Sequence, residues 1–180
     1  MPQPATDLVN RLRIPAYIVT AYMAVGSLID IGATTWPPLT HDLRWRLAIE
    51  SFSTGASGTV LLAVLVFLAF AWAAANRLAL GIGFAYCAIV GVGYLAESVS
   101  FALDSLQIKG QVAAEQLSRY NVGMVWTMSR LLFTGVALLY LAIVAIRAFR
   151  RLGETERGVA AGPGAILVGR PAPAADRVKV

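Results

Sequence analysis

Four long apolar segments dominate the pattern of hydrophobic and polar positions along the chain. A helix that crosses a bilayer needs about 20 mostly apolar residues, because each residue adds about 1.5 Å against a hydrocarbon core about 30 Å thick. The segments that reach this length span approximately residues 14–35, 55–75, 78–103 and 121–146. Inside lipid the backbone polar groups must be paired within the segment, so each is expected to be a helix. The pattern therefore predicts an all-α fold: an integral membrane four-helix bundle with outer interfacial helical segments.

The remaining segments predict how the chain is organised around this bundle. Residues 1–13 form an N-terminal segment, residues 14–152 the transmembrane domain and residues 153–180 a tail rich in Gly, Ala, Pro and Arg. The tail has no helical period, so on its own it is predicted to be disordered. Residues 104–119 are expected to be helical extensions of the third and fourth spans that meet near Gly110 and carry Gln107, Gln111 and Gln116.

The connection between the first two spans carries aromatic and basic residues. We expect either a helix in the headgroup zone, capped by Thr40, or an outward extension of the second span. Trp and Arg at this depth are typical interfacial anchors. The anchoring residues predicted here are Trp36, Trp45, Arg44 and Arg46.

Basic residues are divided unevenly between the two sides of the predicted bundle. An even number of spans places both termini on one side, together with the short connection at Arg77. Membrane proteins carry an excess of Lys and Arg in their cytoplasmic connections, so both termini are predicted to be cytoplasmic. The ten residues on the richer side are Arg11, Arg13, Arg77, Arg147, Arg150, Arg151, Arg157, Arg170, Arg177 and Lys179, against Arg44, Arg46, Lys109 and Arg119 on the other.

Composition agrees with a membrane protein. The chain is 58% hydrophobic and 14% charged, whereas soluble domains average about 45–50% apolar and about 25% charged residues. The net charge of +5 would suggest a nucleic-acid partner in a soluble protein, but here its placement fits membrane orientation instead. The basic residues are arginine except Lys109 and Lys179, a bias that suggests a GC-rich bacterial genome and hence the bacterial cytoplasmic membrane.

Three ionisable residues fall inside the predicted spans: Asp30, Glu97 and Arg130. Charged groups in lipid are costly and are by default a functional hypothesis. At 1.5 Å per residue, Arg130 lies about 15 Å from the outer end of its span and Glu97 about 9 Å. We therefore predict an intramembrane network of the three. It either fixes helix register, since an unpaired buried charge is unfavourable, or relays protons or ions.

Small residues spaced four apart predict close helix packing. One such stripe runs through Ala79, Gly83, Cys87 and Gly91, and a shorter one through Ala69 and Ala73. A lone cysteine within an apolar helix is expected to be a buried, inert thiol.

The sequence lacks the residue sets that most enzymes need. His41 is the single histidine. No second histidine and no lysine lies near a group of six serines to act as a base, namely Ser51, Ser53, Ser57, Ser98, Ser100 and Ser129. The glycine pairs at 81–83 and 91–93 lie inside an apolar span with no preceding strand, which excludes a phosphate loop. We predict no enzyme activity, no metal and no cofactor.

Two functions remain open from the sequence. The first is an accessory subunit, for assembly or stabilisation, of a larger complex such as a respiratory or photosynthetic one. Its partners would be other integral membrane subunits and lipids, with a neighbouring pigment or haem protein and no nucleic acid. The alternative is a small proton- or ion-coupled transporter using the Asp30, Glu97 and Arg130 network. The residues predicted to dock the tail onto a partner are Arg150, Arg151, Arg157 and Arg170.

Overall fold

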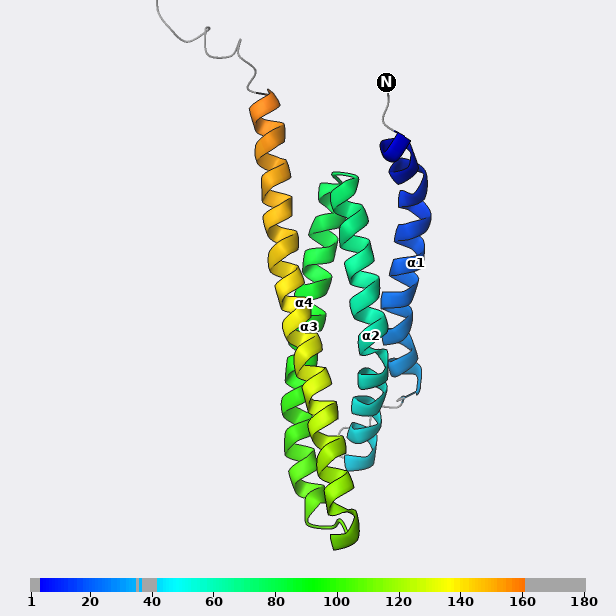
Figure 1. Ribbon diagram of the computed structural model, residues 1–180, viewed down its shortest axis with the longest axis vertical. Coiled ribbons are helices and arrows are strands. Elements are labelled where there is room, and N and C mark those ends of the chain that lie inside the picture. Colours follow the sequence, from blue (N-terminus) through cyan, green and yellow to red (C-terminus); the bar gives the residue numbers. More distant parts are fainter. Residues whose placement is uncertain (1–3, 35, 37–41, 161–180) are drawn as a thin grey trace, which may run out of the picture.

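The described part of the chain folds into four long helices and one short 3₁₀ turn (Figure 1). The computed structural model describes the backbone of residues 4–34, 36 and 42–160. Within these ranges it describes the side chains of residues 8–154, except those at positions 10, 34 and 44. This part contains no strand, and the predicted all-α four-helix architecture is confirmed. All four helices are long and apolar enough to cross a membrane, as expected of a multi-pass membrane protein. The elements are α1 (Pro4–Thr34), α2 (Leu43–Ala73), α3 (Arg77–Lys109), η1 (Ala114–Gln116) and α4 (Leu117–Ala160).

Each helix is longer than the apolar segment that predicted it. α1 begins within the N-terminal segment assigned to residues 1–13, and α2 includes the second half of the first connection. The predicted outward extension of the second span is therefore the arrangement observed. α4 continues through residues 153–160, which had been assigned to the tail. A formed helix gains one hydrogen bond for each residue it adds, so it extends beyond the lipid-facing segment that nucleates it. Thr40 and residues 161–180 lie outside the described residues.

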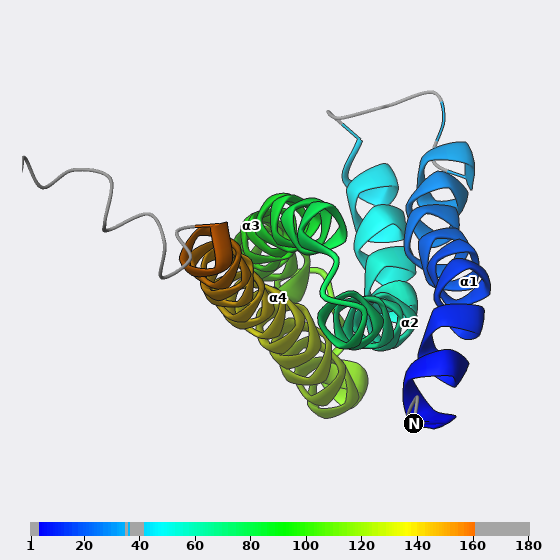
Figure 2. The same ribbon diagram turned by 90° about the horizontal axis from the view of Figure 1, so that it is seen from above.

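The helices pack as two adjoining pairs rather than as a symmetric square (Figure 2). The closest pair is α3 with α4, and α2 packs against both of them. α1 packs along α2, on the side away from α4. One bond reaches α1 from α3, where the Tyr86 hydroxyl donates to the Ala24 carbonyl at 3.0 Å. The core therefore lies among α2, α3 and α4, and only 11% of the apolar window of α1 is buried, against 33–39% for the other three.

The predicted stripe of small residues on α3 is confirmed. Cys87 is fully buried with Ala79, Gly83 and Gly91 on the same face. Gly91 meets Gly135 of α4 so closely that a Cβ on either residue would lie within 3.2 Å of the other's carbonyl oxygen. The second predicted stripe is wrong, because Ala69 and Ala73 are exposed. α2 instead buries a face with larger side chains, namely Val60, Val64 and Leu68.

The two ends of the bundle differ. Both helix ends nearest the termini lie at one end, which we call the termini end; it also holds the α2–α3 turn (Figure 1). In that turn Ala75 has a positive φ of 48°, and the Asn76 side chain accepts a hydrogen bond from Ala79 N at 3.1 Å. The opposite end, with Gly110 and η1, is called the hairpin end, because there α3 and α4 extend beyond α1 and α2.

Candidate functional site

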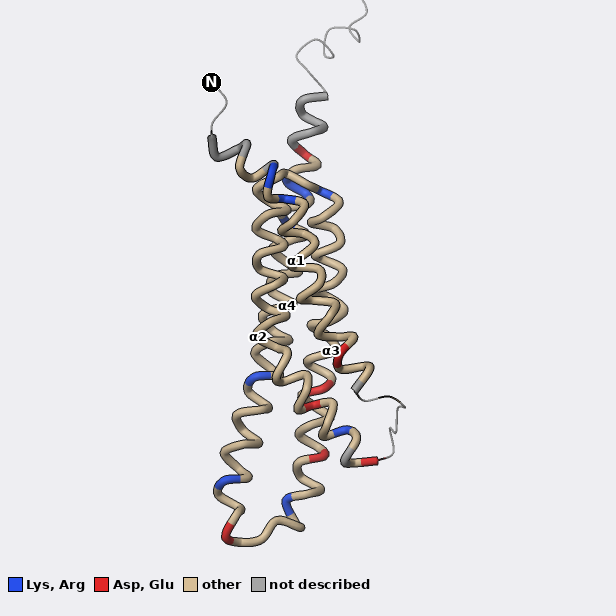
Figure 3. The backbone as a smooth tube through the Cα atoms, turned by 90° about the vertical axis from the view of Figure 1, so that its right-hand side faces the viewer, with Lys and Arg blue, Asp and Glu red and all other residues tan. Residues whose placement is uncertain are grey.

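Acidic residues gather toward the hairpin end of the bundle (Figure 3). Glu50 lies near the start of α2, whereas Glu97 and Asp104 lie in the second half of α3. Because α2 and α3 run in opposite directions, these positions meet at the same level. The polar chemistry of the chain therefore concentrates there, while basic residues dominate the termini end.

An ion pair joins α2 to α3 at this level. Arg46 Nε lies 2.8 Å from Asp104 Oδ2, and Arg46 Nη2 lies 2.9 Å from Asp104 Oδ1. Two parallel N–H···O bonds make this the bidentate arrangement in which arginine binds a carboxylate most strongly. The Asp104 side chain is 6% exposed and that of Arg46 is 30% exposed. The pair therefore holds one end of α2 against α3 with its guanidinium at the surface.

Two further carboxyl groups line a cavity beside this pair. Glu50 is 2% exposed, and within the described part of the chain neither of its side-chain oxygens has a hydrogen-bond partner. Glu97 Oε1 is also buried without a partner there, although the Ser53 side chain hydrogen-bonds to the Glu97 carboxyl group. The cavity has a volume of about 300 Å³. Its lining residues are Trp45, Arg46, Ile49, Glu50, Ala96, Glu97 and Ser100.

A row of hydroxyl groups continues from the cavity into the bundle. Ser53 and Ser57 are buried on the same face of α2 as Glu50, at helical spacings of three and four residues. The Tyr94 hydroxyl donates to the Ser53 carbonyl at 3.2 Å. Arg130 Nη2 donates to Ser57 Oγ at 3.3 Å, so α4 is tied to the same row. Together these groups form a polar seam through α2, α3 and α4.

The structure distributes the predicted Asp30, Glu97 and Arg130 network over two places. Glu97 lines the cavity, and Arg130 is hydrogen-bonded to Ser57 in the seam. Glu97 is bonded to Ser53, and the ion pair in this part of the described structure joins Arg46 to Asp104 instead. Asp30 is exposed near the end of α1, which packs on the far side of α2. The role of the three residues stays a prediction.

The predicted anchoring and docking residues have mixed surroundings. Trp36 is 77% exposed and Trp45 lines the carboxyl cavity, while Arg46 forms the ion pair. The Arg44 side chain lies outside what the structure describes. Arg150 and Arg151 are exposed on α4. Arg157 belongs to α4, but its side chain is not among those described, and Arg170 lies outside the described residues.

Sequence reasoning missed Glu50, the most buried acidic residue of the described chain. It falls within the segment assigned to the connection before the second span, so it was not counted as intramembrane. A signal was present in the spacing of Glu50, Ser53 and Ser57, which places all three on one helical face. Asp104 lies on the same polar face of α3 as Glu97, and it is buried by its ion pair.

The cavity can bind a small cationic or hydrogen-donating group. Burying a carboxylate oxygen away from water without a hydrogen-bond partner costs free energy. Binding a proton, a cation or a hydrogen-bond donor of another molecule offsets that cost. Among the described residues, no group of three His, Cys, Asp or Glu residues could hold a metal ion.

No protein-family model, curated protein or solved structure shows significant similarity to the chain.

Proposed function

We propose that this chain is an accessory subunit that assembles or stabilises a larger membrane protein complex, and that it is not itself an enzyme. The observation that carries the proposal is the reach of the α3–α4 hairpin. α3 has 33 residues, which corresponds to about 50 Å, whereas the hydrocarbon core of a bilayer is about 30 Å thick. The hairpin end therefore extends beyond the acyl chains.

The part of the hairpin beyond the acyl chains is still apolar. If the core begins at Leu78, next to Arg77, it ends about 20 residues later on α3. Leu106 lies beyond both that level and the predicted third span, and it is 63% exposed. Val122 on the facing helix is 69% exposed. Large apolar side chains at this level indicate a protein surface that covers them, because acyl chains do not reach there.

The surroundings of these apolar residues have the composition of a protein interface. Exposed polar residues flank them, and interfaces combine an apolar centre with a polar rim. The partner we propose is a second integral membrane subunit whose extramembrane part contacts the hairpin end. The polar residues of this rim are Gln107, Lys109, Gln111, Gln116 and Arg119.

Charge placement supports a docking role more than transport across the membrane. No Asp, Glu, Lys, Arg or His occurs in residues 14–29, 51–75, 78–96 or 131–146. The half of each span nearest the termini therefore has no charged group to continue a relay. The same distribution supports a cytoplasmic position for both termini in a bacterial inner membrane, because basic residues flank the spans there.

Native purification tests the proposal. After solubilisation in mild detergent, the tagged chain, expressed at its natural level, should co-purify with other integral membrane proteins in a fixed ratio. The absorption spectrum of that complex then tests the prediction of a respiratory or photosynthetic host with a haem or pigment. Consistent migration as a free monomer or homodimer would overturn the proposal.

A second candidate function, a small proton- or ion-coupled carrier, is favoured by one observation. Glu50 and Glu97 place carboxyl oxygens without partners around a cavity. Carboxyl groups in such positions are used by ion-coupled transporters to bind the coupling ion.

For this carrier, replacement of Glu50 by Gln should abolish ion flux in liposomes, because the amide keeps the shape but binds neither a proton nor a cation. Glu115→Gln is the matched control, since Glu115 is exposed on η1 at the same end. Equal flux in the wild type and the Glu50 variant, or no flux in the wild type, removes this candidate.

A further inference from the structure

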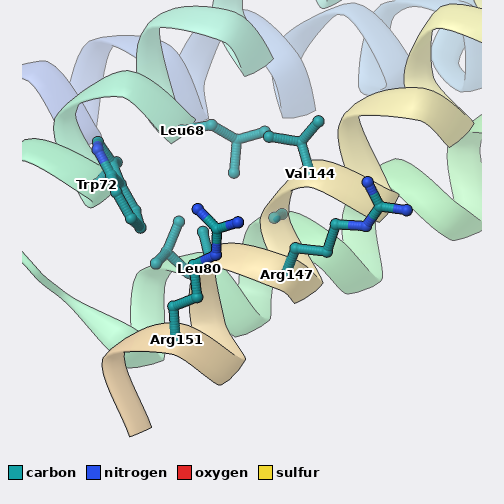
Figure 4. A pocket seen from close by; sticks show the side chains of 8 residues that line it. Leu68, Trp72, Leu80, Val144, Arg147 and Arg151 are labelled. Atoms are coloured by element: carbon teal, nitrogen blue, oxygen red, sulfur yellow. The ribbon is translucent and has the colours of Figure 1, made fainter. Parts of the chain in front are cut away.

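A second cavity of about 300 Å³ lies at the termini end, between α2 and α4 with α3 as its floor (Figure 4). Its floor is apolar, since Leu80 and Ala145 are each 1% exposed and Leu68 is 8% exposed. Trp72 forms one wall and is half exposed. The residues that line it are Leu68, Trp72, Leu80, Val144, Ala145, Arg147, Ala148 and Arg151.

Two arginines on one helical face border this apolar cavity. Arg147 and Arg151 are one turn apart on α4, and both are exposed. The Arg151 guanidinium extends into the space between Trp72 and Leu68, whereas that of Arg147 is turned outward on the Val144 side (Figure 4). Like charges at this spacing repel each other slightly, and an anion between them removes the repulsion.

The neighbouring charges reinforce the preference for an anion. Arg150 lies on the same turn, and Arg77 of the α2–α3 turn lies 4.8 Å from the centre of the Phe149 ring. Glu154 is the acidic residue with a described side chain on this part of α4. Arg151 also interacts elsewhere in the chain, but a guanidinium has five N–H donors and can serve two partners.

We propose that this cavity binds one anionic glycerophospholipid. Its phosphate would lie between Arg147 and Arg151, and part of one acyl chain would lie along Leu68, Leu80 and Val144. Trp and Arg side chains together mark the headgroup level of a membrane, and basic pockets between transmembrane helices bind anionic headgroups. This inference is independent of the proposed accessory role.

The size of the cavity selects a lipid over a second protein. One turn of a helix about 10 Å wide and 5.4 Å long occupies about 400 Å³. The cavity, at about 300 Å³, does not hold such a turn, but it lies at the lower end of the range of about 300–1,000 Å³ for small-molecule pockets. A single flexible acyl chain fits a space of this volume with a mainly apolar lining.

Native mass spectrometry of the full chain in detergent tests the proposal. Titration with dioleoyl-phosphatidylglycerol should give a species with one bound lipid, whereas phosphatidylcholine with the same acyl chains should bind far more weakly. The double variant Arg147→Gln/Arg151→Gln should lower the affinity for phosphatidylglycerol about 30-fold, because each basic residue near a lipid surface is worth about 1 kcal/mol.

A matched variant separates this site from general surface charge. Arg11→Gln/Arg13→Gln removes two exposed charges on α1 at the same end and should change the affinity less than about twofold. Ala148→Leu narrows the cavity while keeping both arginines, and it should also weaken binding. Equal binding of the two lipids, an equal loss in both double variants, or full displacement of the lipid by inorganic phosphate would overturn the proposal.

Discussion

At the scale of single residues, the Arg46–Asp104 pair fixes α2 against α3 near the carboxyl cavity. The Asp104 carboxylate is buried and relies on this guanidinium for its hydrogen bonds. A buried charge that loses its partner is unfavourable, whereas replacing both partners with apolar groups is often neutral.

The variant Arg46→Met should therefore lower the thermal midpoint of the detergent-solubilised protein, because it leaves the Asp104 carboxylate buried and unpaired. The double variant Arg46→Met/Asp104→Leu should recover most of the loss. A thermal-unfolding series of the wild type, both single variants and the double variant measures the coupling between the two residues. Additive effects of the two single changes would show that the pair contributes nothing.

Individual polar residues were only partly predictable from the sequence. Hydropathy identified Glu97 and Arg130 because both interrupt long apolar segments. It did not identify Glu50, because this residue lies where the sequence is already polar and its burial comes from tertiary packing. Which residue an arginine contacts depends on how each helix is rotated about its own axis. The pattern of apolar residues along the sequence does not determine that rotation.

At the scale of elements, α3 and α4 pack most closely where two glycines meet. A Cβ added at Gly135 would lie 2.7 Å from Leu95 Cδ2 and 3.1 Å from the Gly91 carbonyl oxygen. The leucine side chain can move, but the backbone oxygen moves only with the helix. At Gly123, which lies nearer the start of α4, an added Cβ would have no such atom within 4 Å.

The variant Gly135→Ala should therefore destabilise the protein by about 1–3 kcal/mol, the usual cost of overpacking. Gly123→Ala on the same helix should leave the stability unchanged or raise it by up to about 1 kcal/mol, since Ala favours helix over Gly. Thermal unfolding monitored by circular dichroism compares the two. Equal effects would contradict close packing at the Gly91–Gly135 contact.

The small-residue stripe on α3 was predictable because close helix contacts in membranes favour Gly, Ala and Cys at spacing four. The same rule failed for Ala69 and Ala73, since alanine also occurs on lipid-facing surfaces. Helix ends were underestimated because hydropathy detects the lipid-facing segment alone, and the helices α1, α2 and α4 continue past it.

At the scale of the whole molecule, the number of spans and the common end for both termini followed from the sequence. The choice of neighbours did not. α1 is as apolar as a spanning helix requires, yet it packs mainly on α2 and leaves most of its surface uncovered. Hydropathy counts spans, whereas their packing depends on which side chains fit together.

A comparison of two exposed leucines of α3 tests whether the apolar hairpin end contacts another membrane subunit. Leu106→Gln changes the hairpin end, and Leu78→Gln changes the opposite end of α3; both side chains are highly exposed, at 63% and 76%. The first should release the chain from its complex during native purification, while the second should leave the complex intact, with unchanged thermal midpoints for both free chains. Retention of the Leu106 variant in the complex, or equal release of the two variants, would contradict the account.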